Sequence, residues 1–236
     1  MKFFLFFLFF VFTFAKDIYV AACANVTYVM PDIIASFNKS YPNVKVNLII
    51  SSSGKLTAQL LHGAKYDVFV SADTKYPNFL YQKHIAITPP KVYAKGKLVL
   101  FSLRNISDNA LLKADKIAIA NPKTAPYGEA AVEYLKNSAI YNQVKNKLIY
   151  APSVAGAFLY TLKGADIGII AKSLVYSDKI KNLRFYYKDL STDKYSPINQ
   201  SACLISDSKE AREFFDFLYS PKAKKIFAKY GYVVND

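Results

Sequence analysis

Apolar runs that end in small polar residues recur along this chain, and each is followed by apolar residues at helical spacing. The first run is DIYVAACANVT (residues 17–27), and the second is VKVNLIISSSG (residues 44–54). Both are rich in β-branched residues and read as strands. The apolar residues predicted to share one helix face are Val26, Met30, Ile33, Ile34 and Phe37 after the first strand, and Leu56, Leu60 and Leu61 after the second. Each polar end is therefore predicted to join a strand to a helix.

The same unit returns in the middle of the chain, at KIAIANPKTAPYG (residues 116–128) and LIYAPSVAG (residues 148–156). The other predicted elements are strands at 66–73, 95–102 and 165–170, and two helices within 208–232 separated at Ser220-Pro221. Strands that alternate with helices predict α/β layers around a mostly parallel sheet. Ligands of such sheets bind beyond the carboxyl ends of the strands, where the helix N-termini point.

Four polar strand ends are the main chemical feature of the sequence. Helix capping alone explains any one of them. Four ends that converge would gather several neutral hydrogen-bond donors, a setting that suits a small anion. A nucleotide phosphate loop is excluded, because the pattern that would include Gly54-Lys55 needs Gly at position 49 and Ser or Thr at position 56, where the chain has Ile49 and Leu56.

The first fifteen residues, MKFFLFFLFFVFTFA, have the features of a secretory signal peptide. A lysine precedes a short apolar run, and small residues stand before a predicted cleavage site after Ala15. The run is shorter than the roughly 20 residues that span a bilayer, so a membrane anchor is disfavoured. We therefore expect a periplasmic protein whose mature chain begins at Lys16.

The chain carries a formal net charge of +14, from 31 basic and 17 acidic residues. The lysines are scattered, and the arginines, Arg104, Arg184 and Arg212, belong to no aromatic–basic motif, so we expect no nucleic-acid partner. The charge is consistent either with a solvated surface or with a field that attracts small anions. The sequence leaves open whether Cys23 and Cys203 form a disulfide or remain free thiols.

No cluster of residues predicts catalysis or a metal cation. His62 and His84 read as surface residues, while Asp67 and Asp73 flank a predicted strand and read as loop residues. No histidine, cysteine or carboxylate spacing matches a metal site. We therefore expect no enzyme, no catalytic residue and no direct ligand to a metal cation.

Beyond these patterns, the chain resembles the periplasmic molybdate-binding proteins of ABC transporters, the ModA family. The stretches that carry the resemblance are AACANVT, SSSGKLTAQLLHGAKYDVFVSAD, NPKTAPYGEAAVEYL, SVAGAFLYTLKGADIGII and SPKAKKIFAKYGY. The resemblance implies an α/β periplasmic binding protein of the type II-like class, with two lobes, two chain crossovers and the ligand in the cleft between the lobes. Lobe I would comprise residues 16–96 plus 197–236, and lobe II residues 97–196.

The resemblance also implies the residues that bind the oxyanion. Asn25 occupies a position that often carries serine in the family, and its amide can donate in the same way. Ser53 matches a hydroxyl ligand, while Tyr127 and Val154 match positions that supply backbone N–H groups; the Tyr127 hydroxyl is a further candidate donor. The supporting residues implied beside them are Ala24, Ser52 and Ser153.

One position departs from the family. Many members carry a tyrosine that binds the anion at the end of the returning strand, where this chain has Ala171. Asn25 and Tyr127 could together replace that donor, or the preference among oxyanions could differ. The sequence leaves both alternatives open.

The implied function is capture of molybdate, and of tungstate, by neutral donors and delivery to an inner-membrane ABC permease, with no cofactor and with the receptor as a monomer. A deprotonated tetrahedral dianion offers only acceptors, whereas hydrogen phosphate also carries a proton that would lie unpaired at a cost of about 1–3 kcal/mol. The alternatives are a receptor for another oxyanion such as sulfate or phosphate, a secreted enzyme, or a surface adhesion protein.

Overall fold

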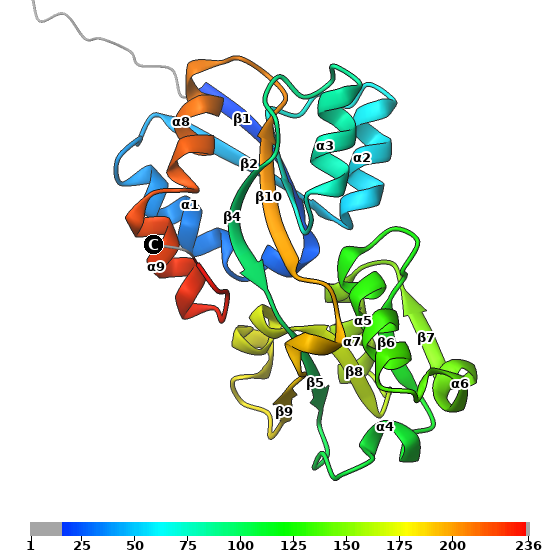
Figure 1. The fold of residues 1–236 in the computed structure, drawn as a ribbon. Helices are drawn as coiled ribbons and strands as arrows, with labels where there is room; N and C mark the ends of the chain where they lie inside the picture. Colours follow the sequence, from blue (N-terminus) through cyan, green and yellow to red (C-terminus); the bar gives the residue numbers. More distant parts are fainter. Residues whose placement is uncertain (1–15, 235–236) are drawn as a thin grey trace, which may run out of the picture.

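The computed structural model describes residues 16–234, and the predicted signal peptide at residues 1–15 lies outside them. Two five-stranded sheets, each with its own helices, form the two halves of the molecule. Figure 1 shows these halves one above the other, joined by the chain passing between them. No helix within residues 16–234 has the length and apolar character needed to cross a bilayer.

The first sheet belongs to the half that holds both described ends of the chain. In spatial order its strands are β2 (Val44–Ser51), β1 (Lys16–Cys23), β3 (Val68–Ser71), β10 (Ile198–Leu204) and β4 (Lys91–Gly96). The helices of this half are η1 (Ala24–Val26), α1 (Met30–Asn38), α2 (Ser53–Leu61), α3 (Lys75–Gln82), α8 (Lys209–Phe217) and α9 (Pro221–Lys229).

The second sheet is formed by the middle of the chain. In spatial order its strands are β7 (Leu148–Ala151), β6 (Ile117–Ala120), β8 (Ile167–Ala171), β5 (Leu98–Ser102) and β9 (Tyr186–Asp189). Its helices are α4 (Ala110–Lys113), α5 (Pro126–Asn137), α6 (Tyr141–Val144), α7 (Val154–Leu162) and the short η2 (Lys145–Lys147), η3 (Lys172–Tyr176), η4 (Asp178–Ile180) and η5 (Thr192–Lys194).

Two chain passages connect the sheets. The chain leaves the first sheet at the end of β4 and enters the second at β5, with Lys97 alone between the two strands. It returns between β9 and β10 (Figure 1). The expected two-lobe α/β architecture with two crossovers is therefore confirmed.

The expectation of a mostly parallel sheet was wrong, because each sheet is evenly mixed. In the first, β1 pairs in parallel with β2 and β3, whereas β10 is antiparallel to β3 and β4. In the second, β6 is parallel to β7 and β8, whereas β5 is antiparallel to β8 and β9. The antiparallel pairs all involve β5 or β10, the strands by which the chain enters the second sheet and returns to the first.

Burial and capping explain why the elements form where they do. Strands β6 and β8 are buried along their whole length, which accounts for their nearly continuous apolar sequences IAIA and IGIIA. Helices α8 and α9 begin after Ser208 and Ser220, whose side chains accept hydrogen bonds from the backbone N–H three residues later. The break predicted at Ser220-Pro221 is therefore the start of α9.

Strand register brings the polar strand ends together. Cys23 of β1 pairs with Ser51 of β2, so the residues after these strands leave the sheet side by side. In the second sheet Ala120 of β6 pairs with Ala151 of β7. Two pairs of neighbouring strand ends, one from each sheet, therefore lie where the two halves meet.

Candidate functional site

A small pocket lies between the halves, beyond the carboxyl ends of the parallel strands. The residues that line it are Cys23, Ala24, Asn25, Ser52, Ser53, Ala72, Ala125, Pro126, Tyr127 and Val154. Its volume of about 10 Å³, counted as space for the centre of a water molecule, corresponds to about one water molecule. A larger hollow of about 320 Å³ lies beside β4 and is bounded by Lys91, Tyr219 and Lys224. None of the residues from the four polar strand ends lines this hollow.

The first half supplies the start of α2 to the pocket wall. Ser53 is the first residue of α2, and its hydroxyl oxygen accepts the backbone N–H of Ala72 at 3.0 Å. That bond leaves the hydroxyl hydrogen of Ser53 available to a ligand. The hydroxyl of Ser52 is buried and has no partner within the described part of the chain. The first N–H groups of an α-helix lack partners inside the helix, so this wall presents both hydroxyl and backbone donors.

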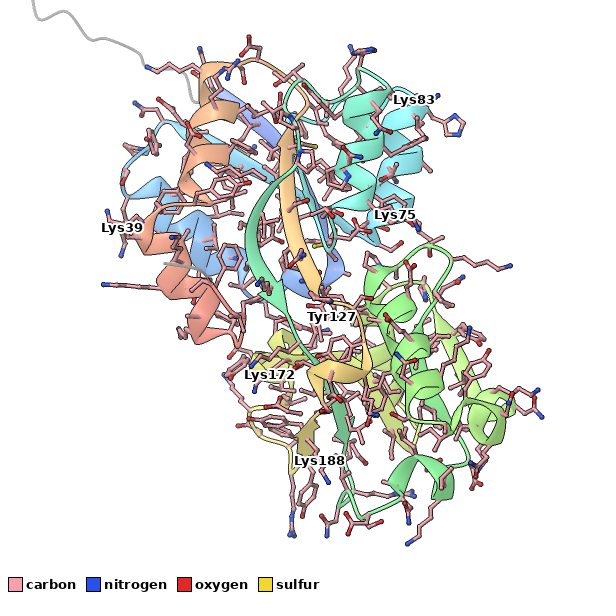
Figure 2. The ribbon with its side chains drawn as sticks, viewed as in Figure 1. Lys39, Lys75, Lys83, Tyr127, Lys172 and Lys188 are labelled. Atoms are coloured by element: carbon pink, nitrogen blue, oxygen red, sulfur yellow. The ribbon has the colours of Figure 1, made fainter. Side chains whose placement is uncertain are left out.

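The second half supplies the starts of α5 and α7. Tyr127 is the second residue of α5, and Val154 is the first residue of α7. Figure 2 shows Tyr127 at the junction of the two halves. Ser153 does not line the pocket; its side chain instead accepts the backbone N–H of Gly156 and caps α7. The two helix N-termini direct unpaired backbone donors toward the same space as Ser53.

The side chain of Asn25 is held by a buried network that sequence reasoning missed. Its Nδ2 donates to Oε1 of Gln200 at 2.8 Å and to the hydroxyl of Tyr232 at 2.7 Å. Nε2 of Gln200 donates to the backbone carbonyls of Ala72 and Ile198, both at 3.3 Å, which fixes its orientation. The amide hydrogens of Asn25 that we expected to face the ligand are therefore engaged by the protein, while its Oδ1 is buried without a partner.

The Tyr127 hydroxyl lies at the crossover rather than near the helix starts. A Cβ atom added at Gly96, the last residue of β4, would lie 2.0 Å from this hydroxyl. It would also lie 2.9 Å from Nε2 of Gln200. Tyr127 therefore lines the pocket and packs closely against the crossover at Gly96, and Gln200 of the network that holds Asn25 lies beside the same glycine.

The pocket wall is uncharged. Burial raises the pKa of the Tyr127, Tyr93 and Tyr232 hydroxyls well above the ordinary value, so all three stay protonated. Burial likewise raises the pKa of the Cys23 thiol. The carboxylate of Asp73, which follows the lining residue Ala72 in the sequence, does not line the pocket, and burial raises its pKa. No lysine or arginine is among the residues that line the pocket.

The two cysteines are free and buried. Cys23 lines the pocket, whereas Cys203 packs in a separate apolar cluster with Phe69 and Leu80. The question that the sequence left open is therefore answered in favour of two thiols.

Comparison with known proteins bears on this geometry. The family model for bacterial extracellular solute-binding proteins matches residues 18–233. The chain is 35% identical over 230 residues to the molybdate-binding protein ModA of Azotobacter vinelandii, with 92% of this chain and 90% of the relative covered. It is 34% identical over 231 residues to ModA of Rhodobacter capsulatus, with 94% of this chain and 90% of the relative covered.

The chain is a bacterial extracellular solute-binding protein of the ModA family. The solved structure of the Azotobacter vinelandii periplasmic molybdate-binding protein superimposes with a TM-score of 0.85 at 29% identity, covering 93% of this chain and all of that one. Family membership confirms the resemblance noted from the sequence. Proteins of this family are substrate receptors of ABC transporters and not enzymes, so the expectation of a non-enzymatic protein is confirmed.

Proposed function

We propose that this solute-binding protein captures molybdate, and tungstate with it, in the pocket lined by Asn25, Ser53, Tyr127 and Val154. The observation that carries the proposal is the meeting of three helix N-termini, those of α2, α5 and α7, at one buried and uncharged pocket. The named ligand of the relatives at 34–35% identity points to the same class of anion.

Neutral donors suit a tetrahedral dianion. Hydrogen bonds to a charged group contribute about 1.5–3 kcal/mol each. Since the amide hydrogens of Asn25 are engaged, the candidate donors are the hydroxyls of Ser52 and Ser53 and the backbone N–H groups of Tyr127 and Val154. Four hydrogen bonds at about 2 kcal/mol sum to about 8 kcal/mol, which corresponds to roughly micromolar binding. The helix N-termini add a favourable field, since the positive ends of their dipoles face the anion.

A second candidate ligand is hydrogen phosphate. The observation that favours it is the unpaired Oδ1 of Asn25, because a proton on the anion would give this buried acceptor a partner. The relatives' ligand argues for the fully deprotonated anion, and direct competition between the two anions distinguishes them.

The two halves serve as lobes in this proposal, with residues 16–96 plus 197–236 as lobe I and residues 97–196 as lobe II. The receptor acts as a monomer in the periplasm after cleavage at Ala15, and it delivers the anion to an inner-membrane permease. Ser52 and Ala24 support the site from lobe I, while Ser153 supports it by capping α7.

Calorimetric titration of the purified, anion-free protein tests the proposal. We expect molybdate and tungstate to bind with micromolar or tighter affinity, and sulfate and phosphate to compete poorly. Phosphate binding tighter than molybdate binding would favour the second candidate. Failure of molybdate to bind at millimolar concentration would contradict the proposal.

A further inference from the structure

Two of the hydrogen bonds that join the halves are made by residues at or beside the pocket wall. The Ser173 hydroxyl, in η3 of the second half, donates to the backbone carbonyl of Asn25 at 2.7 Å, and both residues are buried. The backbone N–H of Gly54, in α2 of the first half, donates to the carbonyl of Thr124 at 2.9 Å. We call these two bonds the latch.

Each bond of the latch begins at or beside a proposed anion ligand. Asn25 is itself a lining residue, and Gly54 follows Ser53. Thr124 precedes the lining residues Ala125 and Pro126. Any motion that separates the halves must therefore break bonds at the pocket wall.

Asn25 is fixed to its own half, so its bond to Ser173 is the one that spans the halves. Its carbonyl also accepts the Tyr232 hydroxyl at 3.1 Å, and its amide is held by Gln200 and Tyr232, all within the first half. Ala171, at the position where many family members carry an anion-binding tyrosine, is fully buried and offers no side-chain donor. Ser173, two residues later, supplies the polar side-chain contact from this part of the second half.

The other bond of the latch is sterically tight. A Cβ atom at residue 54 would lie 2.6 Å from the Tyr76 hydroxyl and 2.9 Å from the Thr124 carbonyl oxygen. The Tyr76 hydroxyl in turn donates to the Lys123 carbonyl at 3.5 Å. Only glycine at residue 54 permits this approach of the halves without displacement.

We propose that Ser173 is a positioning residue that retains the anion by holding the second half against the carbonyl of Asn25, with the Gly54–Thr124 bond as its counterpart at the pocket wall. This inference rests on the proposed oxyanion site. It makes the Ser173 hydroxyl a determinant of the rate constant with which the anion dissociates. The hydroxyl of Ser173 does not touch the anion; its bond forms when the halves close and breaks when they separate.

Substitution of Ser173 by alanine tests the proposal in the full-length mature protein. The association rate constant for molybdate is measured by stopped-flow tyrosine fluorescence and Kd by calorimetry, and their product gives the dissociation rate constant. We expect dissociation to accelerate about 3- to 10-fold, since one buried hydrogen bond is lost while Tyr232 still pairs with the Asn25 carbonyl. Association should stay within about twofold of wild type, because the open receptor is unchanged.

The matched control is Ser102→Ala. The buried Ser102 donates its hydroxyl hydrogen to the Asp166 carbonyl at 2.8 Å, in a partly buried serine–carbonyl bond that lies wholly within the second half. We expect this variant to lose thermal stability while it keeps the wild-type dissociation rate. A wild-type dissociation rate in Ser173→Ala, or an equal acceleration in both variants, would overturn the proposal.

Gly54→Ala keeps the test decisive if Ser173→Ala does not fold. Alanine is favoured over glycine within a helix, so α2 should not be weakened. The added Cβ should nevertheless lower affinity at least 10-fold by keeping the halves apart, and unchanged affinity would contradict the latch.

If the wild-type protein binds sulfate or phosphate in place of molybdate, the proposed ligand is wrong and the latch is tested with that anion. If molybdate, tungstate, sulfate and phosphate all fail to bind, both the proposed function and the latch are overturned.

Discussion

The side-chain amide nitrogen of Asn25 lies 2.8 Å from the side-chain oxygen of Gln200, although 175 positions separate the two residues in the sequence. Gln200 is fully buried on β10, and its own amide group donates to two backbone carbonyls. Because these carbonyls can only accept, Gln200 must present its oxygen to Asn25. The orientation of a pocket residue is thus set by a strand that returns from the other half.

Replacing Gln200 with leucine should therefore weaken anion binding without removing any group that lines the pocket. The variant leaves one amide hydrogen of Asn25 and two carbonyls without their partner, each at a cost of about 1–3 kcal/mol. We expect the free energy of unfolding to fall by a few kcal/mol and Kd for molybdate to rise about 10-fold. Chemical denaturation and calorimetry measure the two effects.

Gln143→Leu is the control for this prediction. Gln143 is exposed on α6, and its side chain makes one long bond of 3.5 Å to the Ala139 carbonyl. Stability and affinity should both remain close to wild type. Wild-type affinity in a folded Gln200→Leu protein would show that Asn25 needs no such support.

Ser53→Ala should reduce affinity directly. The substitution removes a hydroxyl hydrogen that is free to bind the anion, because the hydroxyl oxygen accepts the Ala72 N–H. The loss of one hydrogen bond to a charged ligand, about 1.5–3 kcal/mol, corresponds to a roughly 10- to 100-fold increase in Kd. Ser208→Ala, at the cap of α8, should cost about 1 kcal/mol of stability and leave Kd unchanged.

Asp73→Asn should stabilise the protein at neutral pH. Burial raises the pKa of this carboxyl in the folded state, so the folded state disfavours the ionised form. Stability of the wild type therefore falls as pH rises from the unfolded-state value toward the raised folded-state pKa, and then stays level. Asparagine keeps the oxygen that accepts from Ser71 and Tyr76 while it removes the charge.

The gain from Asp73→Asn should be present at pH 7 and absent near pH 3, where both forms are neutral. Denaturation at the two pH values measures it. Asp108→Asn, whose side chain is 98% exposed, should show no such pH-dependent gain. Loss of a negative charge beside Ala72 should also tighten molybdate binding a few-fold. A destabilised Asp73→Asn protein at pH 7 would contradict the argument.

Gly96→Ala should disturb the crossover and the pocket together. The new Cβ would lie 2.0 Å from the Tyr127 hydroxyl, which must move away and take the start of α5 with it. We expect Kd for molybdate to rise about 10-fold or more. Adding Tyr127→Phe, which deletes the obstructing hydroxyl, should recover part of the affinity. No recovery in the double variant would contradict the assignment to the hydroxyl and point to the other close contacts of the new Cβ, at 2.9 Å from Nε2 of Gln200 and from Cζ of Tyr127.

The local patterns predicted the parts of the site that depend on neighbours in the sequence. The polar junctions that contain Ser53 and Val154 were predicted because a strand, a polar end and an apolar helix face follow one another within about fifteen residues, and parallel register then places such ends together. The roles of Ser53 and Val154 as anion ligands came from the family resemblance. The two-lobe arrangement came from the family resemblance, because no local pattern marks where a chain crosses between sheets.

The network behind the pocket could not be predicted in this way. Gln200 and Tyr232 reach Asn25 from 175 and 207 positions away, and neither belongs to a strand-to-helix junction. Their partners depend on the antiparallel return of β10 and on the end of α9, both tertiary features. The parallel-sheet expectation was wrong for the same reason, since the strands that cross between halves pair antiparallel to their neighbours.

Crystals grown with molybdate, with diffraction data collected at the molybdenum absorption edge, test the central claim most directly. We predict one strong anomalous peak between the halves, with the oxygens around it within about 3 Å of the Ser53 hydroxyl and of the backbone nitrogens of Tyr127 and Val154. A peak on the lysine-lined hollow outside β4, or no peak in protein that binds molybdate in solution, would contradict the account.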